Sequence, residues 1–193
     1  RINDFYLDSR YLDEVAGQTQ WGQAVSCLSG RTAVYRRSLL LEISHDFMTE
    51  TFMGVPCNSG EDKRLTMLTL RKGYKTWMQQ NARVWSTFPR GARTFFRQRL
   101  RWARNTWRSD LRALRERWVF RHKWLAFSML DKAVSSFTLL VAPVFMIFAL
   151  VTRHFAIAGF LALWWLVSRG IKYLPHLQRR PLDVLLLPAF ILV

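Results

Sequence analysis

The pattern of hydrophobic and polar positions predicts an α/β domain in the first half of the chain. Four short apolar stretches are strand-like: residues 23–28, 32–35, 74–79 and 82–87. Helix-like segments at 37–43 and 61–72 are interspersed with them. This alternation of strand and helix favours an α/β fold. Residues 1–21 are polar, contain four acids and show no strong period.

The helix predicted at 61–72 has clear end signals. Ser59 and Asp62 fit an S-x-x-D capping box at its start, and Gly73 fits the stop just after its end. The preceding stretch, residues 51–60, is rich in glycine, proline and asparagine and is loop-like.

From Thr94 to about Trp118 the period becomes helical. One apolar stripe repeats at spacings of three and four, with arginines on the other faces: Phe96, Leu100, Ala103, Trp107, Leu111, Leu114 and Trp118. A basic amphipathic helix with aromatic residues on its apolar side suits the headgroup boundary of an anionic membrane leaflet. The alternative is a solvated basic helix on a soluble core.

The last third of the chain is apolar in long runs. Residues 133–151 carry no charge, and at ~1.5 Å per residue they can cross a hydrocarbon core of ~30 Å. A shorter run at 154–168 and the beginning of a third at 182–193 follow. By the positive-inside rule, the basic segments 83–123 and 169–181 lie in the cytoplasm. The alternative is a buried helical hairpin in a soluble protein.

Composition supports the membrane interpretation. The 193 residues carry a net charge of +16 and are 50% hydrophobic, but the two properties occupy different segments. A soluble nucleic-acid binder explains the basic segment and not the uncharged one. Two cysteines, Cys27 and Cys57, exclude a dense disulfide framework. Because the chain starts at Arg1 and stops within an apolar run, we expect it to be an internal piece of a longer protein.

Few residues are arranged for familiar chemistry. The sequence has no P-loop, no GxGxxG, no HExxH and no nucleophile elbow, and its four histidines are isolated along the chain. One candidate is Gly60-Glu61-Asp62, where a carboxylate at a helix N-terminus could accept a proton from a substrate hydroxyl. The alternative is that both acids only complement the helix dipole.

The second candidate lies on the amphipathic helix. Gln98, Arg101, Trp102 and Asn105 fall at i, i+3, i+4 and i+7, on a face distinct from the apolar stripe. A guanidinium beside an amide and an indole suits a diphosphate with a sugar or base to stack upon. A surface helix could also contain this set by chance.

Taken together and in this order, three segments carry a resemblance: CLSGRTAVYRRSLL (27–40), GEDKRLTMLTLRKGYKT (60–76) and RQRLRWARNTWR (97–108). The sequence resembles the processive, membrane-embedded family 2 glycosyltransferases, particularly hyaluronan synthases and rhizobial chitooligosaccharide synthases. The resemblance covers roughly residues 23–193.

The resemblance implies a domain organisation. Residues 1–93 would be the C-terminal part of a GT-A-like α/β catalytic domain. Residues 94–132 would be amphipathic interfacial helices, and residues 133–193 would be transmembrane helices forming an exit channel. The protein would then be an integral protein of the plasma or inner membrane, with its catalytic part in the cytoplasm.

The resemblance also implies roles for seven residues. Asp62, beside Glu61, matches the general base that deprotonates the acceptor hydroxyl, with inversion to a β-linkage. Gln98, Arg101 and Trp102 match the motif that closes over the donor diphosphate and the acceptor end. Ser29 and Gly30 match a loop beside the acceptor. Hyaluronan synthases tend to have proline where this chain has Arg31, which leaves the identity of the polymer open.

The implied partners are a UDP-sugar donor (UDP-GlcNAc and/or UDP-GlcA), a growing glycan and the lipid bilayer, and no nucleic acid is expected. Mg²⁺ or Mn²⁺ is implied by the family, but its DxD ligands have no counterpart in this chain, so we expect this piece alone to be inactive. The alternatives are a non-processive family 2 transferase acting on a lipid or other acceptor, and a non-catalytic basic membrane protein that binds anionic lipid or nucleic acid.

Overall fold

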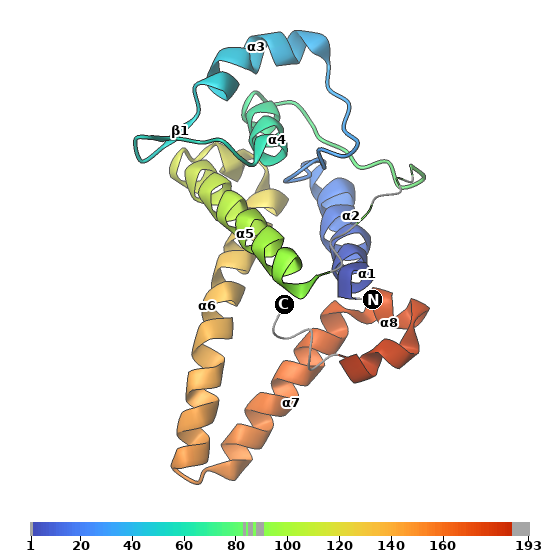
Figure 1. The fold of residues 1–193 in the computed structure, drawn as a ribbon, viewed down its shortest axis with the longest axis vertical. Coiled ribbons are helices and arrows are strands. Elements are labelled where there is room, and N and C mark those ends of the chain that lie inside the picture. The colour runs from blue at the N-terminus through green and yellow to red at the C-terminus, as the bar shows by residue number, and fades with distance from the viewer. Residues whose placement is uncertain (1, 83, 85–86, 88–90, 187–193) are drawn as a thin grey trace. The chain divides into compact units, whose positions relative to one another are not determined.

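The computed structural model describes residues 2–82, 84, 87 and 91–186, most of which are helical (Figure 1). They form two compact units. One contains the described residues of 15–128, and the other contains residues 2–14 together with 129–186. The predicted boundaries at residues 93 and 132 separate catalytic, interfacial and transmembrane parts. The two compact units do not test them, so this division stays a prediction.

The unit of residues 15–128 is built from short and long helices. In chain order they are α2 (Val15–Gly17), the π-helix Gln18–Gly22, α3 (Arg37–Met48), α4 (Glu61–Arg71), α5 (Ala92–Arg115), the 3₁₀ turn Trp118–Arg121 and the start of α6 (Lys123–Val151). A small core joins α3 to α4 through Leu39, Ile43 and Leu68. The helices predicted at 37–43, at 61–72 and from Thr94 are confirmed.

The ends of α4 follow from glycine conformation. At its C-terminus, Gly73 has φ 88°, its N–H donates to Leu70 O at 2.9 Å, and the N–H of Tyr74 donates to Thr69 O at 3.2 Å. These two bonds make a Schellman motif, which confirms the predicted stop. The predicted capping box is wrong. The N-cap is Gly60, with φ 87°, and the hydroxyl of Ser59 bonds to α5 instead of to its own helix.

Within the described residues, the sheet is limited to one hairpin. Strands β1 (Thr51–Phe52) and β2 (Val55–Pro56) pair antiparallel in the stretch that the sequence predicted as loop. Met53 and Gly54 connect them, with φ of 52° and 82°. Two successive positive φ values are those of a type I′ turn, whose twist matches the strands on either side.

The four strands predicted between residues 23 and 87 do not form in the described part of the chain. Two of these stretches, 23–28 and 74–79, are joined by one isolated parallel bridge, between Ala24 and Thr76. Thr32 is a bend and residues 33–35 have no regular secondary structure, and Val34 is 92% exposed. Strand formation needs a neighbour that pairs with its N–H and C=O groups. Part of the 82–87 prediction lies outside the described residues. The α/β GT-A fold therefore stays a proposal.

The other unit contains α1 (Ile2–Asp8), the π-helix Ser9–Glu14, most of α6, α7 (Phe155–Lys172), α8 (Leu174–Arg179) and the 3₁₀ segment Pro181–Leu186. The helical character of residues 2–22 was not predicted. Their hydrogen bonding alternates between α and π patterns, and the π turns rotate successive side chains off a 3.6-residue period.

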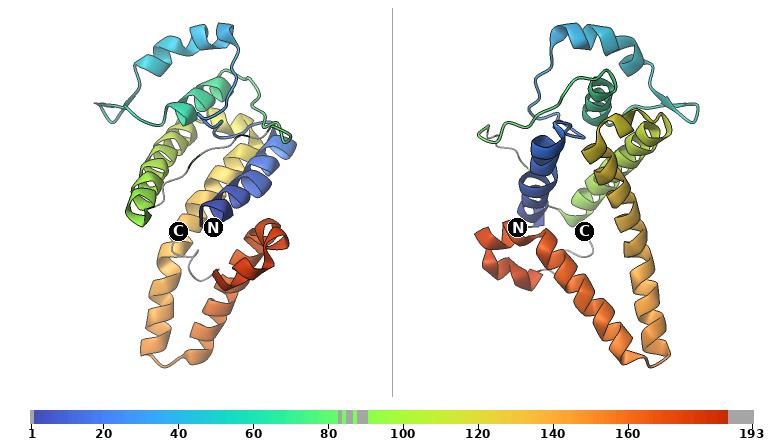
Figure 2. Two further views of the ribbon diagram at one scale, coloured as in Figure 1. Left: turned by 45° about the vertical axis from the view of Figure 1, so that its right-hand side comes forward. Right: turned by 180° about the vertical axis from the view of Figure 1, so that it is seen from behind.

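Helices α6 and α7 are joined by a short turn at Thr152–His154 (Figure 2). Among the described residues, α6 is the one helix long and apolar enough to cross a membrane, by length and composition, and 6% of its most apolar window is buried. Helix α7 contributes a shorter apolar segment, Phe155–Ser168. Phe148 and Trp164 are both 63% exposed. These side chains are therefore not packed as in the core of a soluble domain.

His176 on α8 lies between two carboxylates, so it is not isolated as the sequence suggested. Its ring is fully buried, with Nδ1 2.9 Å from Asp8 Oδ2 and Nε2 3.0 Å from Asp183 Oδ2. The three residues come from α1, α8 and the 3₁₀ segment Pro181–Leu186. Asp8 is 168 residues from His176 in the sequence and Asp183 is 7 residues from it, so the sequence pattern did not reveal the cluster.

We expect His176→Ala to destabilise this unit by about 3 kcal/mol, because it leaves the buried Asp183 carboxylate without its partner. Limited proteolysis of the full-length protein over a temperature series measures the change. His154→Ala, on the exposed hairpin turn, is the matched control. Equal thermal midpoints for the two variants would contradict the prediction.

Candidate active site

The Gly60-Glu61-Asp62 segment forms the first turn of α4. Asp62 is half-buried, and its Oδ1 accepts a hydrogen bond from the backbone N–H of Lys63 at 2.7 Å. Glu61 is exposed, and its Oε2 accepts from the N–H of Gly60 at 3.0 Å. Both acids therefore complement the positive end of the helix dipole. Asp62 remains partly accessible at the helix start, the position from which a carboxylate can reach a substrate hydroxyl.

The structure places the Ser29–Gly30 loop beside Asp62. A Cβ on Gly30 would lie 3.5 Å from the Cβ of Asp62. The loop is tied to α4 by Thr66, a fully buried residue one turn after Asp62. Its Oγ1 donates to Asp62 O at 2.8 Å and accepts from the N–H of Leu28 at 3.0 Å. These bonds bring together two of the three segments that sequence reasoning singled out.

Tyr35 belongs to the same neighbourhood and was not predicted. Its hydroxyl lies 3.2 Å from Thr66 Oγ1. Burial raises the pKa of Tyr35; the hydrogen bond between Tyr35 and Thr66 lowers it, and the nearby charges of Cys27 and Asp62 raise it further. Tyr35 therefore presents a neutral hydroxyl close to Asp62, the candidate general base. The sequence offered no signal for Tyr35 as a site residue, because 32–35 was predicted as a short strand and its contact with Thr66 spans 31 residues.

The third segment lies on α5. Gln98 and Trp102 are half-buried and Arg101 is exposed, all on a continuous helix. One turn further on, Asn105 is buried and its Oδ1 accepts a hydrogen bond from Ser59 Oγ at 3.0 Å. Since Ser59 directly precedes Gly60-Glu61-Asp62, the structure places Asn105, four residues after Arg101 and three after Trp102, against the start of α4.

Two ion pairs connect α4 to α5 and its C-cap. Lys63 Nζ lies 2.8 Å from Asp110 Oδ1, with 6% and 10% of the two side chains exposed. Arg71 pairs with Glu116 at 3.5 Å near the other end of α4. The residues that α5 buries are accordingly Asn105, Ser109, Asp110 and the small Ala113.

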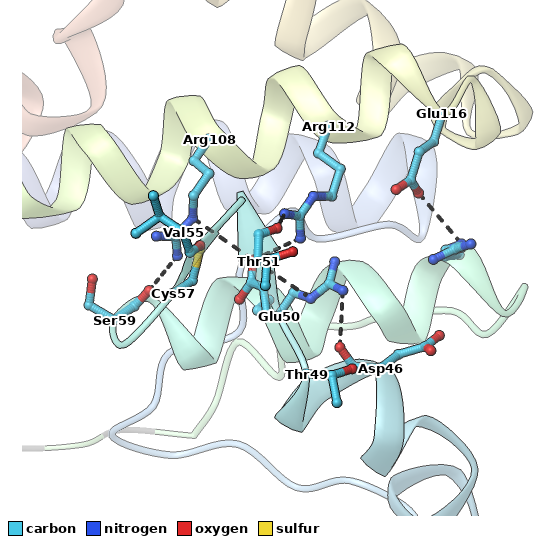
Figure 3. Close-up of polar contacts among 12 residues, drawn as sticks. Asp46, Thr49, Glu50, Thr51, Val55, Cys57, Ser59, Arg108, Arg112 and Glu116 are labelled. Atoms are coloured by element: carbon cyan, nitrogen blue, oxygen red, sulfur yellow. Dashed lines mark hydrogen bonds and ion pairs between the residues drawn. The ribbon is translucent and has the colours of Figure 1, made fainter. Parts of the chain in front are cut away.

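Glu50 is the centre of an arginine cluster between the hairpin and the two helices (Figure 3). Its carboxylate is 2.8 Å from Arg112 Nη1, 3.8 Å from Arg64 Nε and 3.9 Å from Arg108 Nε. Arg112 also donates to Thr51 O, and Arg108 donates to Ser59 O. Burial lowers the pKa of Arg64, while Glu50 acts in the opposite direction. One carboxylate thus offsets three cations beside the loop that leads to Asp62.

The predicted apolar stripe of α5 faces away from this packing. Phe96 is 67% exposed and Leu111 is 49% exposed, with Leu100 and Trp107 near 40%. A soluble helix normally buries its apolar stripe. Here the stripe is open from Phe96 to Leu111, whereas Leu114 is half-buried and Trp118, just after the helix, is buried. An open apolar stripe of this kind suits a helix that lies at an apolar surface.

Within the described part of the chain, no group of three or more His, Cys, Asp or Glu side chains could hold a metal ion. The divalent ion implied by the resemblance therefore finds no ligand set among these residues. Cys27 and Cys57 are not joined in a disulfide.

A protein-family model described as "Glycosyltransferase like family 2" matches residues 2–105. This chain belongs to that family. The matched segment contains all seven residues to which the resemblance assigned roles, and it ends at Asn105. Membership of family 2 is thus confirmed, while the finer resemblance to hyaluronan synthases stays a prediction.

Relatives of this family 2 chain include proteins named N-acetylglucosaminyltransferase. The one from Sinorhizobium fredii is 42% identical over 103 residues, or 53% of this chain and 25% of the relative. Those from Azorhizobium caulinodans and Rhizobium meliloti are 39% and 40% identical over similar lengths, covering 26% and 24% of those proteins. The match therefore spans about a quarter of the length of these curated relatives.

We expect Glu50→Gln to destabilise the residues 15–128 unit by about 3 kcal/mol, because three buried or half-buried guanidinium groups lose their shared counter-charge. Thermal unfolding of the purified full-length protein measures this. The matched control is Glu42→Gln, which breaks the exposed Lys72 pair at a cost below about 1 kcal/mol. Similar midpoints for both variants would show that the cluster does not hold the fold.

Proposed function

We propose that this chain is part of a membrane-bound, inverting glycosyltransferase that transfers GlcNAc from UDP-GlcNAc onto a growing β-linked glycan, in the manner of a chitooligosaccharide or hyaluronan synthase. The observation that carries the proposal is the convergence of three segments. Asp62 lies beside Gly30 and is joined through Ser59 and Asn105 to the helix that bears Gln98, Arg101 and Trp102. The names of the relatives support GlcNAc as the sugar.

The reaction is a single displacement. The acceptor hydroxyl oxygen bonds to the anomeric carbon of the donor, and the bond from that carbon to the diphosphate oxygen breaks, with its electron pair leaving on UDP. Asp62 takes the hydroxyl proton. Attack opposite an α-linked UDP inverts the centre and yields a β-linkage. Glu61, the neighbouring acid, holds the N–H of Gly60 at the helix start.

Arg101 and its neighbours act on the leaving group. The exposed guanidinium can donate two parallel hydrogen bonds to the diphosphate and stabilise the charge that develops as UDP departs. The half-buried Trp102 offers a ring face to a sugar, and the amide of Gln98 offers a donor and an acceptor. The Ser29–Gly30 loop borders the acceptor. Mg²⁺ or Mn²⁺, held outside the described residues, would neutralise the diphosphate.

The bilayer is the proposed surroundings of the remaining helices. The exposed stripe of α5 and the exposed apolar side chains of α6 and α7 would otherwise face water. With α6 and α7 as membrane helices, the positive-inside rule places the candidate site in the cytoplasm and the Thr152–His154 turn outside.

We expect membranes that contain the full-length protein to release UDP from UDP-GlcNAc, and chelation of divalent metal to stop this release. Asp62→Asn should lower the rate of UDP release at least ~100-fold, because the general base is lost.

Arg101→Ala should lower the rate of UDP release more than Arg101→Lys, because lysine keeps the charge but not the planar fork. Asp13→Asn, at an exposed acid in the π-helix Ser9–Glu14, is the matched control.

The same assay separates the alternatives. Release that requires UDP-GlcA as well as UDP-GlcNAc would identify an alternating polymer, and single-sugar products would identify a non-processive transferase. No release from any donor above the Asp62→Asn background, with protein correctly inserted, would overturn the transferase proposal.

Topology can be tested by cysteine labelling in intact cells. In a background without other reactive cysteines, Thr152→Cys should react with a membrane-impermeant maleimide. Lys75→Cys, an exposed residue on the proposed cytoplasmic side, should react only after the membrane is broken. Labelling of Lys75→Cys in intact cells would contradict the proposed orientation.

A further inference from the structure

Gly60 meets Asn105 at unusually close range. A Cβ built on Gly60 would lie 2.8 Å from Asn105 Cγ and 2.9 Å from Asn105 Cβ, closer than real side chains approach. Gly60 also has φ 87°, a conformation that other residues adopt at a cost. The side chain of Asn105 therefore lies directly against the backbone from which α4 starts, and no side chain separates the two.

A hydrogen bond fixes this contact in one geometry. Ser59 Oγ donates to Asn105 Oδ1 at 3.0 Å, and Asn105 is 7% exposed. One turn along α5, Arg108 donates to the carbonyl oxygen of Ser59. Two successive turns of α5 thus hold Ser59, by its side chain and by its backbone. An apolar residue could fill the space at 105, but it could not accept the serine hydroxyl.

The contact connects the two motifs that the proposed reaction uses. Asn105 follows Arg101 by four residues and Trp102 by three, so it shares their helix face. Gly60 precedes Asp62 by two residues, within the first turn of α4. Any shift of α5 at Asn105 is therefore transmitted to the backbone that carries the Asp62 carboxylate.

We infer that Asn105 is a positioning residue: it sets the place of the Asp62 carboxylate relative to the donor diphosphate held by Gln98, Arg101 and Trp102. This inference rests on the proposed function. Asn105 lies outside the Gln98–Trp102 motif, and it would act on the reaction indirectly, by holding Ser59 and Gly60 in place. A general base must lie within hydrogen-bond reach of its proton, and a displacement of about 1 Å can cost about 100-fold in rate.

The test compares Asn105→Leu, Ser59→Ala and the double variant in the full-length protein in membranes. UDP release from UDP-GlcNAc gives kcat and KM per amount of folded protein. Each single variant should lower kcat about 10-fold or more while KM for the donor stays within about twofold, because the groups that bind the donor are intact. The double variant should be no slower than the slower single variant, since both remove one contact.

Arg104→Leu, which puts the same side chain at an exposed neighbouring position, controls for the change in α5 itself. Ser59→Ala removes a single oxygen, so it carries the test if Asn105→Leu does not fold. The positioning role would be overturned if the folded single variants kept the wild-type kcat. It would also be overturned if their kcat fell only as far as that of Arg104→Leu. A wild-type protein that releases no UDP would instead overturn the proposed function, and the inference with it.

Discussion

The polar contact between α4 and α5 organises the candidate site. Helix α5 buries Asn105, Ser109, Asp110 and the small Ala113, while most of its apolar stripe stays exposed. An ion pair holds it to α4, and a hydrogen bond holds it to Ser59, just before α4. Such contacts are directional, whereas apolar packing tolerates sliding. The register between the two helices is therefore specified by individual atoms, at the end of α4 where Asp62 lies.

This constraint explains why so many cations lie near one loop. Arg64 comes from α4, and Arg108 and Arg112 come from α5, and all three reach Glu50, which directly precedes β1. The residues 51–60 that follow lead to Gly60 and are held at Thr51 and at Ser59 by the same arginines. The arginines that give the sequence its charge thus act in part as structural ligands of backbone carbonyls, and not only as a surface for anions.

Local signals in the sequence predicted what local physics decides. Helices α4 and α5 and the stop at Gly73 follow from periodicity and glycine conformation, and Gln98, Arg101 and Trp102 lie on one continuous helix as predicted. Contacts between distant residues were not predictable. Ser59 fitted a capping box, but it bonds to Asn105, 46 residues away. His176 looked isolated, but it meets Asp8 across 168 residues. The predicted strands at 23–28 and 74–79 meet in the single Ala24–Thr76 bridge, because pairing depends on partners that a pattern of single residues does not reveal.

The polar character of the α4–α5 contact also determines how it responds to temperature. Burial of apolar surface carries a large heat-capacity change, whereas burial of polar surface carries a smaller one of opposite sign. The cost of removing ions such as Lys63 and Asp110 from water falls on warming. The attachment of α5 to the start of α4 should therefore keep its strength on warming, as the apolar core of α3 and α4 does, because hydrophobic stabilisation weakens on cooling. Warming would then separate the two helices around Asp62 only when the conformational entropy of the whole unit outweighs its contacts.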